Sequence, residues 1–164
     1  MLYDNFGFTL DYAKETDCEE ILNLIKEIAE YEKMTELVTA TKETLHDSIF
    51  VKKRANVIMA RLNGNVIGYL LYFYNFSTFT GTSNIYIEDI YLKKGYRNSG
   101  YGKIMLKVLA KIAIEENAQR IDWVCLNWNE PSLAFYKKNG AKRLDEWILH
   151  RLEYDDINVL AKED

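Results

Sequence analysis

The sequence predicts a mixed α/β domain whose sheet is mainly antiparallel in its first half, and three observations support that prediction. Apolar runs rich in β-branched and aromatic residues are interspersed with runs of helical periodicity. Asn63 and Gly64 separate two of the apolar runs, and an Asn-Gly pair in that position is a strong signal for a β-hairpin. The segment "YRNSGYGK" (96–103) joins a predicted strand to a predicted helix. The expected order of elements is βααβββαβαβ.

The first half of the chain is expected to contain four strands and two helices. The opening strand covers residues 6–13, and Thr16 and Glu19 fit the capping box that begins the first helix. Apolar residues recur in that helix at helical spacing, at Ile21, Leu22, Ile25, Ile28 and Ala29. The remaining elements are a helix over 42–50 and strands over 55–62, 65–74 and 84–92.

The second half is expected to alternate helices and strands. Residues 101–116 have an apolar stripe at helical spacing and predict a helix, and residues 120–126 predict the next strand. A short helix over 129–141 has Pro131 in its first turn and Gly140 at its end, where these residues are favoured. The chain is expected to close with a strand over 147–154.

Composition favours one folded domain spanning residues 1–164. Hydrophobic residues make up 48% of the chain and aromatic residues 13%, which argues against a disordered protein. The chain has one proline and no tract rich in serine, glycine or proline, so no linker is expected. The longest apolar run, residues 66–74, is too short to span a membrane. The N-terminal segment lacks the features of a secretion signal, so we expect a cytoplasmic protein without a membrane partner.

The cysteines, histidines and net charge argue against several classes of site. Cys18 and Cys125 are too few for a disulfide framework, and neither has the spacing of metal ligands. His46 and His150 lie far apart in the sequence, so no metal is expected. The net charge of −4 makes the chain a poor binder of nucleic acids.

Charge is spread unevenly along the chain. Residues 14–47 hold ten acidic residues and four lysines, whereas residues 93–120 hold seven basic residues and two glutamates. This asymmetry fits a basic site for an anionic ligand and an acidic site for a cationic one. It fits two solvated helix faces equally well, and the charge pattern alone leaves both interpretations open.

The segment 96–103 has the chemistry of an anion-binding loop. Gly100 and Gly102 let backbone N–H groups approach a ligand without an intervening Cβ, and the N-terminus of the following helix favours phosphate. Arg97 and Lys103 would add positive charge. The spacing fits neither a Walker loop nor a dinucleotide-binding GxGxxG loop. A lone GxG also fits a tight turn that binds no ligand.

The longer pattern Arg97-x-x-Gly100-x-Gly102, after a strand and before an apolar helix, resembles motif A of the GNAT N-acetyltransferase superfamily. Three further segments extend the resemblance: "WNEPSLAFYKKNGA" (128–141), "IKEIAEYEKM" (25–34) and "IYIEDIYL" (85–92). Together they resemble the branch that acetylates spermidine, spermine and other diamines, and also thialysine. The likeness extends from residue 8 to residue 154 and implies a mainly antiparallel sheet flanked by helices on both faces.

The resemblance implies that acetyl-CoA is the acetyl donor. In the superfamily, motif A cradles the pyrophosphate, the preceding strand pairs with pantetheine through its main chain, and a later short helix contacts the cofactor arm. Asn98 stands where many members have glycine, but the motif leaves that position free. The cofactor-binding residues expected from the resemblance are Ile90, Tyr91, Leu92, Arg97, Asn98, Ser99, Gly100, Tyr101, Gly102, Lys103, Asn129, Ser132 and Tyr136.

The same resemblance implies catalytic roles for Tyr136 and Glu88. Acetyl transfer to an amine needs a base, because an amine with a pKa of about 10 is protonated at neutral pH. Glu88 is expected to accept that proton, directly or through water, and Tyr136 to protonate the departing thiolate. Strand alternation is expected to place Glu88 and Asp89 on opposite faces of the sheet. From the residues alone, Tyr136 also fits a tyrosine packed in the core, and Glu88 a carboxylate in a salt bridge.

The amine site also follows from the resemblance. Tyr31 and Glu32 match the substrate pair of the branch, and the expected substrate-binding residues are Tyr31, Glu32, Glu88, Asp122, Trp123, Val124 and Glu146. Asn127 stands where the spermine-acting relatives have an acidic residue. The missing charge weakens the case for a long polycation and favours a shorter diamine, thialysine or another primary amine.

The expected function is the transfer of the acetyl group of acetyl-CoA to a primary amine of a small cationic substrate, by direct attack in a ternary complex. No cysteine lies at a matching catalytic position, so no acyl-enzyme is expected. The alternatives are a GNAT enzyme for another amine, such as a peptide N-terminus, a lysine or an antibiotic, and a non-catalytic acyl-CoA sensor. Relatives in the branch are typically homodimers, so a homodimer is expected here.

Overall fold

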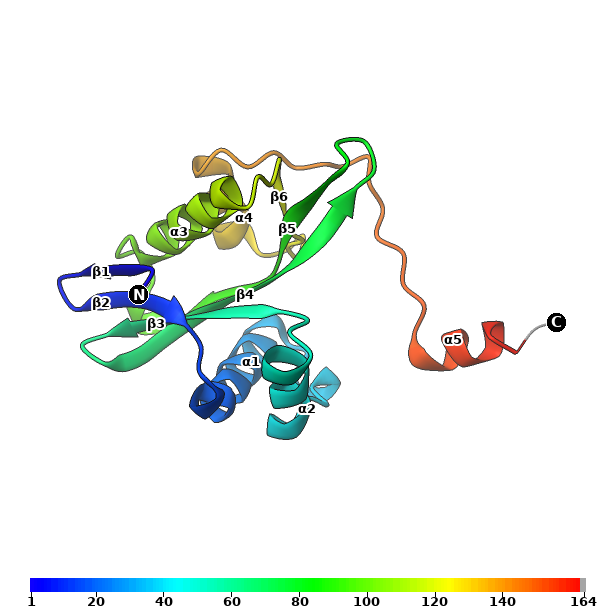
Figure 1. Ribbon diagram of the computed structural model, residues 1–164, viewed down its shortest axis with the longest axis horizontal. Helices are drawn as coiled ribbons and strands as arrows, with labels where there is room; N and C mark the ends of the chain where they lie inside the picture. The colour runs from blue at the N-terminus through cyan, green and yellow to red at the C-terminus, as the bar shows by residue number, and fades with distance from the viewer. Residues whose placement is uncertain (163–164) are drawn as a thin grey trace. The chain divides into compact units, whose positions relative to one another are not determined.

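The computed structural model describes residues 1–162 of the chain (Figure 1). The chain falls into two compact units, Met1–Val124 and Cys125–Asp164. Among the described residues, the first unit holds six strands and three α-helices, and the second holds two α-helices. The expectation of one domain over residues 1–164 stays a prediction.

The sheet of the first unit confirms the predicted mixed, mainly antiparallel architecture. Its strands lie side by side in sequence order, and each pairs antiparallel with the next, except that β5 and β6 are parallel. The opening strand predicted over 6–13 forms at residues 8–12, but an unpredicted strand precedes it, because Phe6 and Gly7 both have a positive φ and turn the chain into a hairpin. The strands are β1 (Tyr3–Asn5), β2 (Phe8–Tyr12), β3 (Asn56–Leu62), β4 (Asn65–Ser77), β5 (Thr82–Leu92) and β6 (Ile121–Asp122).

The hairpin predicted at Asn63 and Gly64 is confirmed. These residues have φ angles of 50° and 83°, as a type I′ turn requires. Leu62 and Asn65 face each other directly at the turn. The turn therefore sets the register of the first pairs between β3 and β4, and a shift between Ala60 and Arg61 moves the remaining pairs by one residue.

Helices cover both faces of this sheet, as expected (Figure 1). α1 (Cys18–Glu32) and α2 (Lys42–His46) lie on one face, and α3 (Tyr101–Glu115) lies on the other. The core on the α1 side includes Ile21, Leu24, Val57, Met59, Tyr69, Leu71 and Tyr91. The core on the α3 side includes Leu10, Ile58, Ile67, Leu70, Ile85, Ile87, Met105, Leu109 and Ile112. Neighbouring strand residues such as Ile58 and Met59 thus fill opposite cores, as alternation requires.

The first helix begins later than the capping box predicts. A 3₁₀ turn over Glu15–Asp17 precedes α1, and Asp17 accepts a hydrogen bond of 2.9 Å from the N–H of Lys14. Thr16 lies inside this turn and not at the N-cap, so the predicted box of Thr16 and Glu19 is wrong. Asp47–Val51 continues α2 as a further helical turn, so the helix predicted over 42–50 is present. Two more short helical turns lie at Thr35–Leu37 and Lys94–Tyr96.

The strand predicted over 120–126 is reduced to the two residues of β6. Asn84 at the start of β5 is fully buried and accepts hydrogen bonds of 2.8 and 3.1 Å from the N–H groups of Gln119 and Arg120. These bonds hold the chain beside β5, but β6 pairs with β5 only at Ile85 and Tyr86. Beyond Tyr86, this edge of β5 has no strand paired with it within residues 1–162.

The second unit contains α4 (Glu130–Lys138) and α5 (Tyr154–Leu160). The strand predicted over 147–154 is wrong, because a strand needs a paired neighbour and none pairs with these residues in the described chain. The N–H of Trp147 bonds only locally, to the carbonyl oxygen of Leu144. The end of the predicted strand instead begins α5, whose first turn is favoured by Asp155 and Asp156.

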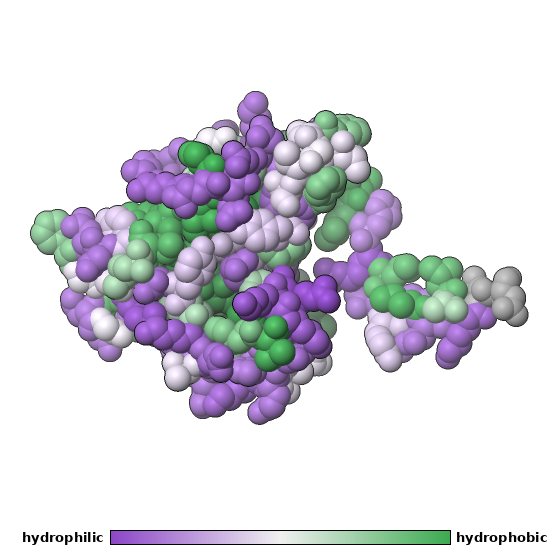
Figure 2. All heavy atoms as spheres, viewed as in Figure 1, coloured by the Kyte–Doolittle hydropathy of each residue, from purple (hydrophilic) through white to green (hydrophobic). Residues whose placement is uncertain are grey.

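Exposed apolar side chains gather on α5 (Figure 2). They belong to Ile157, Val159 and Leu160. Every helix within residues 1–162 is too short or too polar to cross a membrane.

Candidate active site

A β-bulge interrupts β5 at Glu88. Ile87 lies opposite Tyr72 of β4 and Asp89 lies opposite Leu71, so Glu88 is an extra residue with no position opposite it. Bulges bend a strand and redirect its side chains, and they are common beside active sites. The strand that contains the predicted base is therefore irregular at that base.

The bulge places Glu88 and Asp89 on the same face of the sheet. Ile87 before the bulge and Ile90 after it both pack on the α3 side. The two acidic residues between them therefore point to the other face, toward α1. The predicted placement on opposite faces is wrong, because simple alternation holds only for a strand without an inserted residue.

Asp89 is bound by a buried tyrosine on that face. Tyr69 of β4 has no exposed surface, and its hydroxyl donates a hydrogen bond of 2.7 Å to Oδ2 of Asp89. Burial raises the pKa of Asp89 above its usual value, and the hydrogen bond from Tyr69 opposes that rise. Asp89 is therefore easier to protonate than a surface aspartate, because burial disfavours the charged form.

Two glutamates form an acidic group with Asp89. Glu32 is the last residue of α1, and its pKa is raised first by burial and second by the negative charge of Asp89. The pKa of Tyr69 is raised well above its usual value by burial and then by the charges of Asp89, Glu32 and Glu88. Three carboxylates thus act on one hydroxyl, and we call Glu32, Glu88 and Asp89 the acidic triad.

The acidic triad is suited to a cation. Within residues 1–162, neither Glu32 nor Asp89 takes part in an ion pair. The negative charges of Glu32 and Asp89 are partly buried, which raises the free energy of the folded protein, and a bound ammonium group would lower it. Carboxylates in this position can also accept a proton from such a group.

The segment after β5 forms the loop predicted for an anion. Asn98 and Gly100 have φ angles of 63° and 87°, and α3 begins directly afterwards at Tyr101. A Cβ added to Gly100 would meet no atom within 4 Å, so the space beside its backbone is open. The first N–H groups of a helix have no partner inside the helix, and the N-cap glycine has no side chain to bind them. The loop therefore fits a pyrophosphate through its backbone, and asparagine tolerates the conformation at residue 98 better than most residues.

The side chain of Arg97 is bound by β5 and α1. Its Nε donates a hydrogen bond of 2.8 Å to the carbonyl oxygen of Leu92. Its guanidinium lies 4.6 Å from the ring centre of Tyr31 and 5.4 Å from that of Tyr91, which are cation–π distances. The charge of Arg97 is therefore held against two aromatic rings, whereas Lys103 in the first turn of α3 is exposed.

The residues expected beside pantetheine, 90–92, lie where one edge of β5 is unpaired. On one edge this segment pairs with β4, with Gly68 opposite Leu92. On the other edge β6 ends its pairing at Tyr86, and no further strand follows within residues 1–162. Such an edge offers N–H and C=O groups to an extended ligand.

In the second unit, Asn129, Ser132 and Tyr136 lie on or at the start of α4. Asn129 is the N-cap residue, is buried, and accepts a hydrogen bond of 3.4 Å from the N–H of Ser132. The ring of Tyr136 lies 5.5 Å from that of Phe135. The spacing i, i+3, i+7 puts the three predicted residues on one side of this helix.

The other residues predicted for the amine site have different surroundings. Oδ2 of Asp122 accepts hydrogen bonds of 2.7 Å from Nε of Arg120 and 3.3 Å from Nδ2 of Asn75. The charge of Asp122 is therefore already balanced by Arg120. Trp123 packs against the core on the α3 side. The remaining two residues are exposed: Val124 in the first unit and Glu146 in the second.

An open pocket lies apart from these predicted residues. It has a volume of about 400 Å³ and is lined by Lys26, Glu27, Glu30, Thr35 and Val38. None of the predicted site residues lines it. Among residues 1–162, no group of three His, Cys, Asp or Glu side chains is arranged to hold a metal ion.

Two residues of the acidic site, Tyr69 and Asp89, were not among those predicted from the sequence. Asp89 had a signal, since two adjacent acidic residues in an apolar strand are costly unless both are bonded or functional. Tyr69 had none, because it lies in a run of buried residues where a tyrosine is also a common core residue.

Known proteins resemble this chain over most of its length. The model of the acetyltransferase (GNAT) family matches residues 17–141. The thialysine N-epsilon-acetyltransferase of Bos taurus is 36% identical over 161 residues, which cover 91% of this chain and 94% of that protein. The spermidine/spermine N(1)-acetyltransferase-like protein 1 of Homo sapiens is 29% identical over 168 residues, which cover 96% of this chain and 24% of that protein.

A solved structure has the same fold. An integron cassette protein from the mobile metagenome of V. cholerae matches with a TM-score of 0.81 and 26% sequence identity. The match covers 97% of this chain and 100% of that one. The comparisons agree with the family and the branch expected from the motifs.

Proposed function

Because the chain belongs to the GNAT acetyltransferase family, we propose that this N-acetyltransferase moves the acetyl group of acetyl-CoA to a primary amine of a small cationic substrate. The proposed substrates are short diamines, polyamines and thialysine-like amines. The amine attacks directly in a ternary complex, so no acyl-enzyme forms.

The acidic triad is the observation that supports the choice of substrate. Asp89 accepts a hydrogen bond from the buried Tyr69, Glu88 directly precedes it in the bulge, and Glu32 ends the helix that covers the same face of the sheet (Figure 1). A ligand with more than one ammonium group is attracted to such a site. Glu32 follows Tyr31 at the end of α1, and the resemblance implies that this pair contacts substrate. We therefore place the cationic part of the substrate at Glu32 and Asp89, with its reacting nitrogen near Glu88.

Two residues are proposed to move protons. Acetyl-CoA supplies an acetyl group activated as a thioester. The ammonium group must lose a proton before its nitrogen can bond to the acetyl carbon, and Glu88 at the bulge accepts that proton, directly or through water. As the bond between carbon and sulfur breaks, Tyr136 of α4 donates its hydroxyl proton to the sulfur of CoA. The nitrogen that is now bonded to the acetyl carbon releases its second proton to water, and Tyr136 regains a proton from water.

The loop and the unpaired edge of β5 are proposed to hold acetyl-CoA. The N–H groups at the start of α3 bind the pyrophosphate, and Lys103 adds positive charge. The backbone of residues 90–92 binds the pantetheine arm, and the resemblance implies that Asn129 and Ser132 of α4 also contact the cofactor. The open space beside Gly100 supports this arrangement, because a phosphate can approach the backbone there.

A short substrate is favoured over a long polycation. Asn127 contributes no charge where the spermine-acting relatives have an acidic residue. Asp122 is already paired with Arg120. The thialysine enzyme of Bos taurus is 36% identical to this chain, which adds support for a thialysine-like or diamine substrate. A homodimer and a cytoplasmic location stay predictions.

Release of CoA thiol from acetyl-CoA tests this function. The amine panel consists of spermidine, spermine, putrescine, thialysine, lysine and a peptide with a free N-terminus, with a reaction lacking amine as the control. We expect turnover with thialysine or putrescine above that with spermine and the peptide. Turnover with the peptide alone, or tight acetyl-CoA binding with no turnover across the panel, would contradict the proposed substrate class.

A further inference from the structure

The side chain of Arg97 joins the loop to the helix that contributes Glu32 to the acidic triad. Its guanidinium lies over the ring of Tyr31, the residue next to Glu32 in α1. Its Nε is fixed by the hydrogen bond to the carbonyl oxygen of Leu92. One side chain of the proposed CoA loop is therefore packed on the helix end that is proposed to bind the amine.

A second set of contacts connects Tyr91 and Lys93, which lie just before the loop, to α1. Nζ of Lys93 lies 3.4 Å from Oε1 of Glu20 and 3.5 Å from Oε1 of Glu27. The hydroxyl of Tyr91 donates a hydrogen bond of 3.2 Å to Oε2 of Glu27, and the ring of Tyr91 also faces Arg97. The segment 91–97 thus contacts α1 at several points along the helix.

Packing also connects Arg97 to Asp89. The ring centres of Tyr91 and Tyr69 are 6.5 Å apart, and Tyr69 donates its hydrogen bond to Asp89. Arg97 is therefore connected to the acidic triad in two ways, along α1 and through the two tyrosines of the sheet. Both connections consist of residues within the first unit.

We propose that Arg97 is a positioning residue that couples the two substrate sites. CoA orders the loop, Arg97 then orders the end of α1, and the affinity for the amine rises. A residue shared by two sites loses its conformational freedom when the first ligand binds, so the second ligand binds with a smaller entropic penalty. The inference rests on the proposed function, since it takes the loop as the CoA site and the triad as the amine site.

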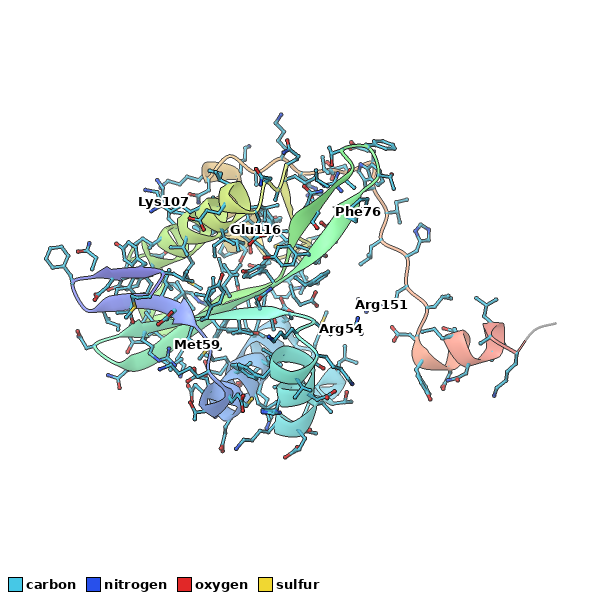
Figure 3. The ribbon with its side chains drawn as sticks, viewed as in Figure 1. Arg54, Met59, Phe76, Lys107, Glu116 and Arg151 are labelled. Carbon is cyan, nitrogen blue, oxygen red and sulfur yellow. The ribbon has the colours of Figure 1, made fainter. Side chains whose placement is uncertain are left out.

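Amide hydrogen exchange with CoA alone tests the coupling without turnover. In the wild-type protein, saturating CoA is expected to slow exchange both at residues 96–103 and at residues 29–34. Arg97→Gln removes the stacked cation and is expected to keep the effect at the loop and lose it at 29–34. Arg54→Gln is the matched control, because it also removes a guanidinium group, but from an exposed arginine just before β3 (Figure 3).

Arg97→Lys provides a second variant. It keeps the positive charge but lacks the planar group that stacks on tyrosine, so it is expected to lose part of the effect at 29–34. If thermal melting shows that Arg97→Gln does not fold, the comparison is made with Arg97→Lys.

Affinity gives an independent readout. Calorimetry with the best amine of the panel is expected to show binding about tenfold tighter with CoA than without it, within the range typical of coupled sites. Because such coupling is reciprocal, the amine should tighten CoA binding by the same factor. In Arg97→Gln both factors are expected to fall to about 1, whereas in Arg54→Gln they are expected to match the wild type.

The outcomes separate this inference from the proposed function. If CoA protects the loop but has no effect at 29–34 in the wild type, or has the same effect there in Arg97→Gln, the inference is overturned and the proposed function stands. If CoA neither binds nor protects residues 96–103, the proposed function fails and the inference fails with it.

Discussion

Oδ2 of Asp89 accepts a hydrogen bond of 2.7 Å from the hydroxyl of Tyr69, which has no exposed surface. This pair connects the core to the proposed amine site, because Tyr69 belongs to the apolar cluster on the α1 side and Asp89 directly follows the bulge of β5. A carboxylate removed from water is tolerated only when hydrogen-bond donors compensate for the lost solvation. The Tyr69 hydroxyl supplies that compensation for Asp89.

Tyr69→Phe should destabilise the protein by about 2 kcal/mol, because it leaves a partly buried carboxylate without its donor. Tyr72→Phe is the matched control: Tyr72 is also buried in β4, and its hydroxyl lies 3.2 Å from the neutral hydroxyl of Tyr12. The loss of that neutral pair should cost about 1 kcal/mol. Urea unfolding at neutral pH measures both values, and an equal cost would show that the charge of Asp89 adds nothing to the bond.

Asp89→Asn should stabilise the fold at neutral pH while it weakens amine binding. Burial raises the pKa of Asp89, so the folded protein binds this proton more readily than the unfolded chain does. The stability that protonation of Asp89 provides is present below the unfolded pKa and is lost as the pH rises through the raised folded pKa. Asparagine stays neutral and still accepts the hydrogen bond from Tyr69.

Thermal melting of the wild type and Asp89→Asn from acid to neutral pH measures the difference in their stability. It should be near zero in acid and should grow to about 1 kcal/mol in favour of Asp89→Asn at neutral pH, a typical size for one substitution. A difference that does not change with pH would contradict a raised pKa for Asp89.

Gly100→Ala should weaken acetyl-CoA binding. Gly100 has a φ of 87°, and the added Cβ would enter the open space beside the loop backbone. Gly64→Ala is the control, because Gly64 has a φ of 83° and is equally open but lies in the hairpin turn. Both variants should lose about 1 kcal/mol of stability through backbone strain. Only Gly100→Ala should raise the KM for acetyl-CoA, by about tenfold, and equal KM values would contradict the loop as the pyrophosphate site.

Tyr136→Phe should lower turnover by about 100-fold, because the thiolate of CoA would leave without a proton donor. Acetyl-CoA binding should change little, since the phenyl ring is retained. Steady-state kinetics with the best amine and calorimetry with CoA measure the two effects. Tyr154→Phe, at an exposed position of α5, is the control. Unchanged turnover in Tyr136→Phe would remove Tyr136 as the acid.

Local sequence signals predicted those parts of the fold that local chemistry determines. Asn63 and Gly64 form the predicted turn because both tolerate a positive φ, and Gly100 forms the predicted loop for the same reason. The strand predicted over 147–154 failed because alternation indicates a strand only where a neighbour pairs with it.

The acidic triad was only partly predictable, because it depends on pairing between strands. Glu32 and Glu88 were expected from the resemblance, but Asp89 was expected on the opposite face. The bulge that redirects Asp89 is a feature of the register between β4 and β5, which neither strand shows alone. The same holds for Arg97. The sequence places this arginine at the start of the predicted loop, but its packing on Tyr31 depends on where α1 ends.

The central claim is that the acidic triad recognises the charge of the substrate. A direct test compares kcat/KM for the best small amine of the panel and for its analogue in which a methyl group replaces the non-reacting ammonium group. The wild-type enzyme should prefer the charged substrate by about tenfold or more, equivalent to about 1.4 kcal/mol. Glu32→Gln should lose most of that preference, whereas Glu36→Gln, at an exposed position in the turn after α1, should keep it. An equal preference in the wild type and Glu32→Gln would contradict the claim.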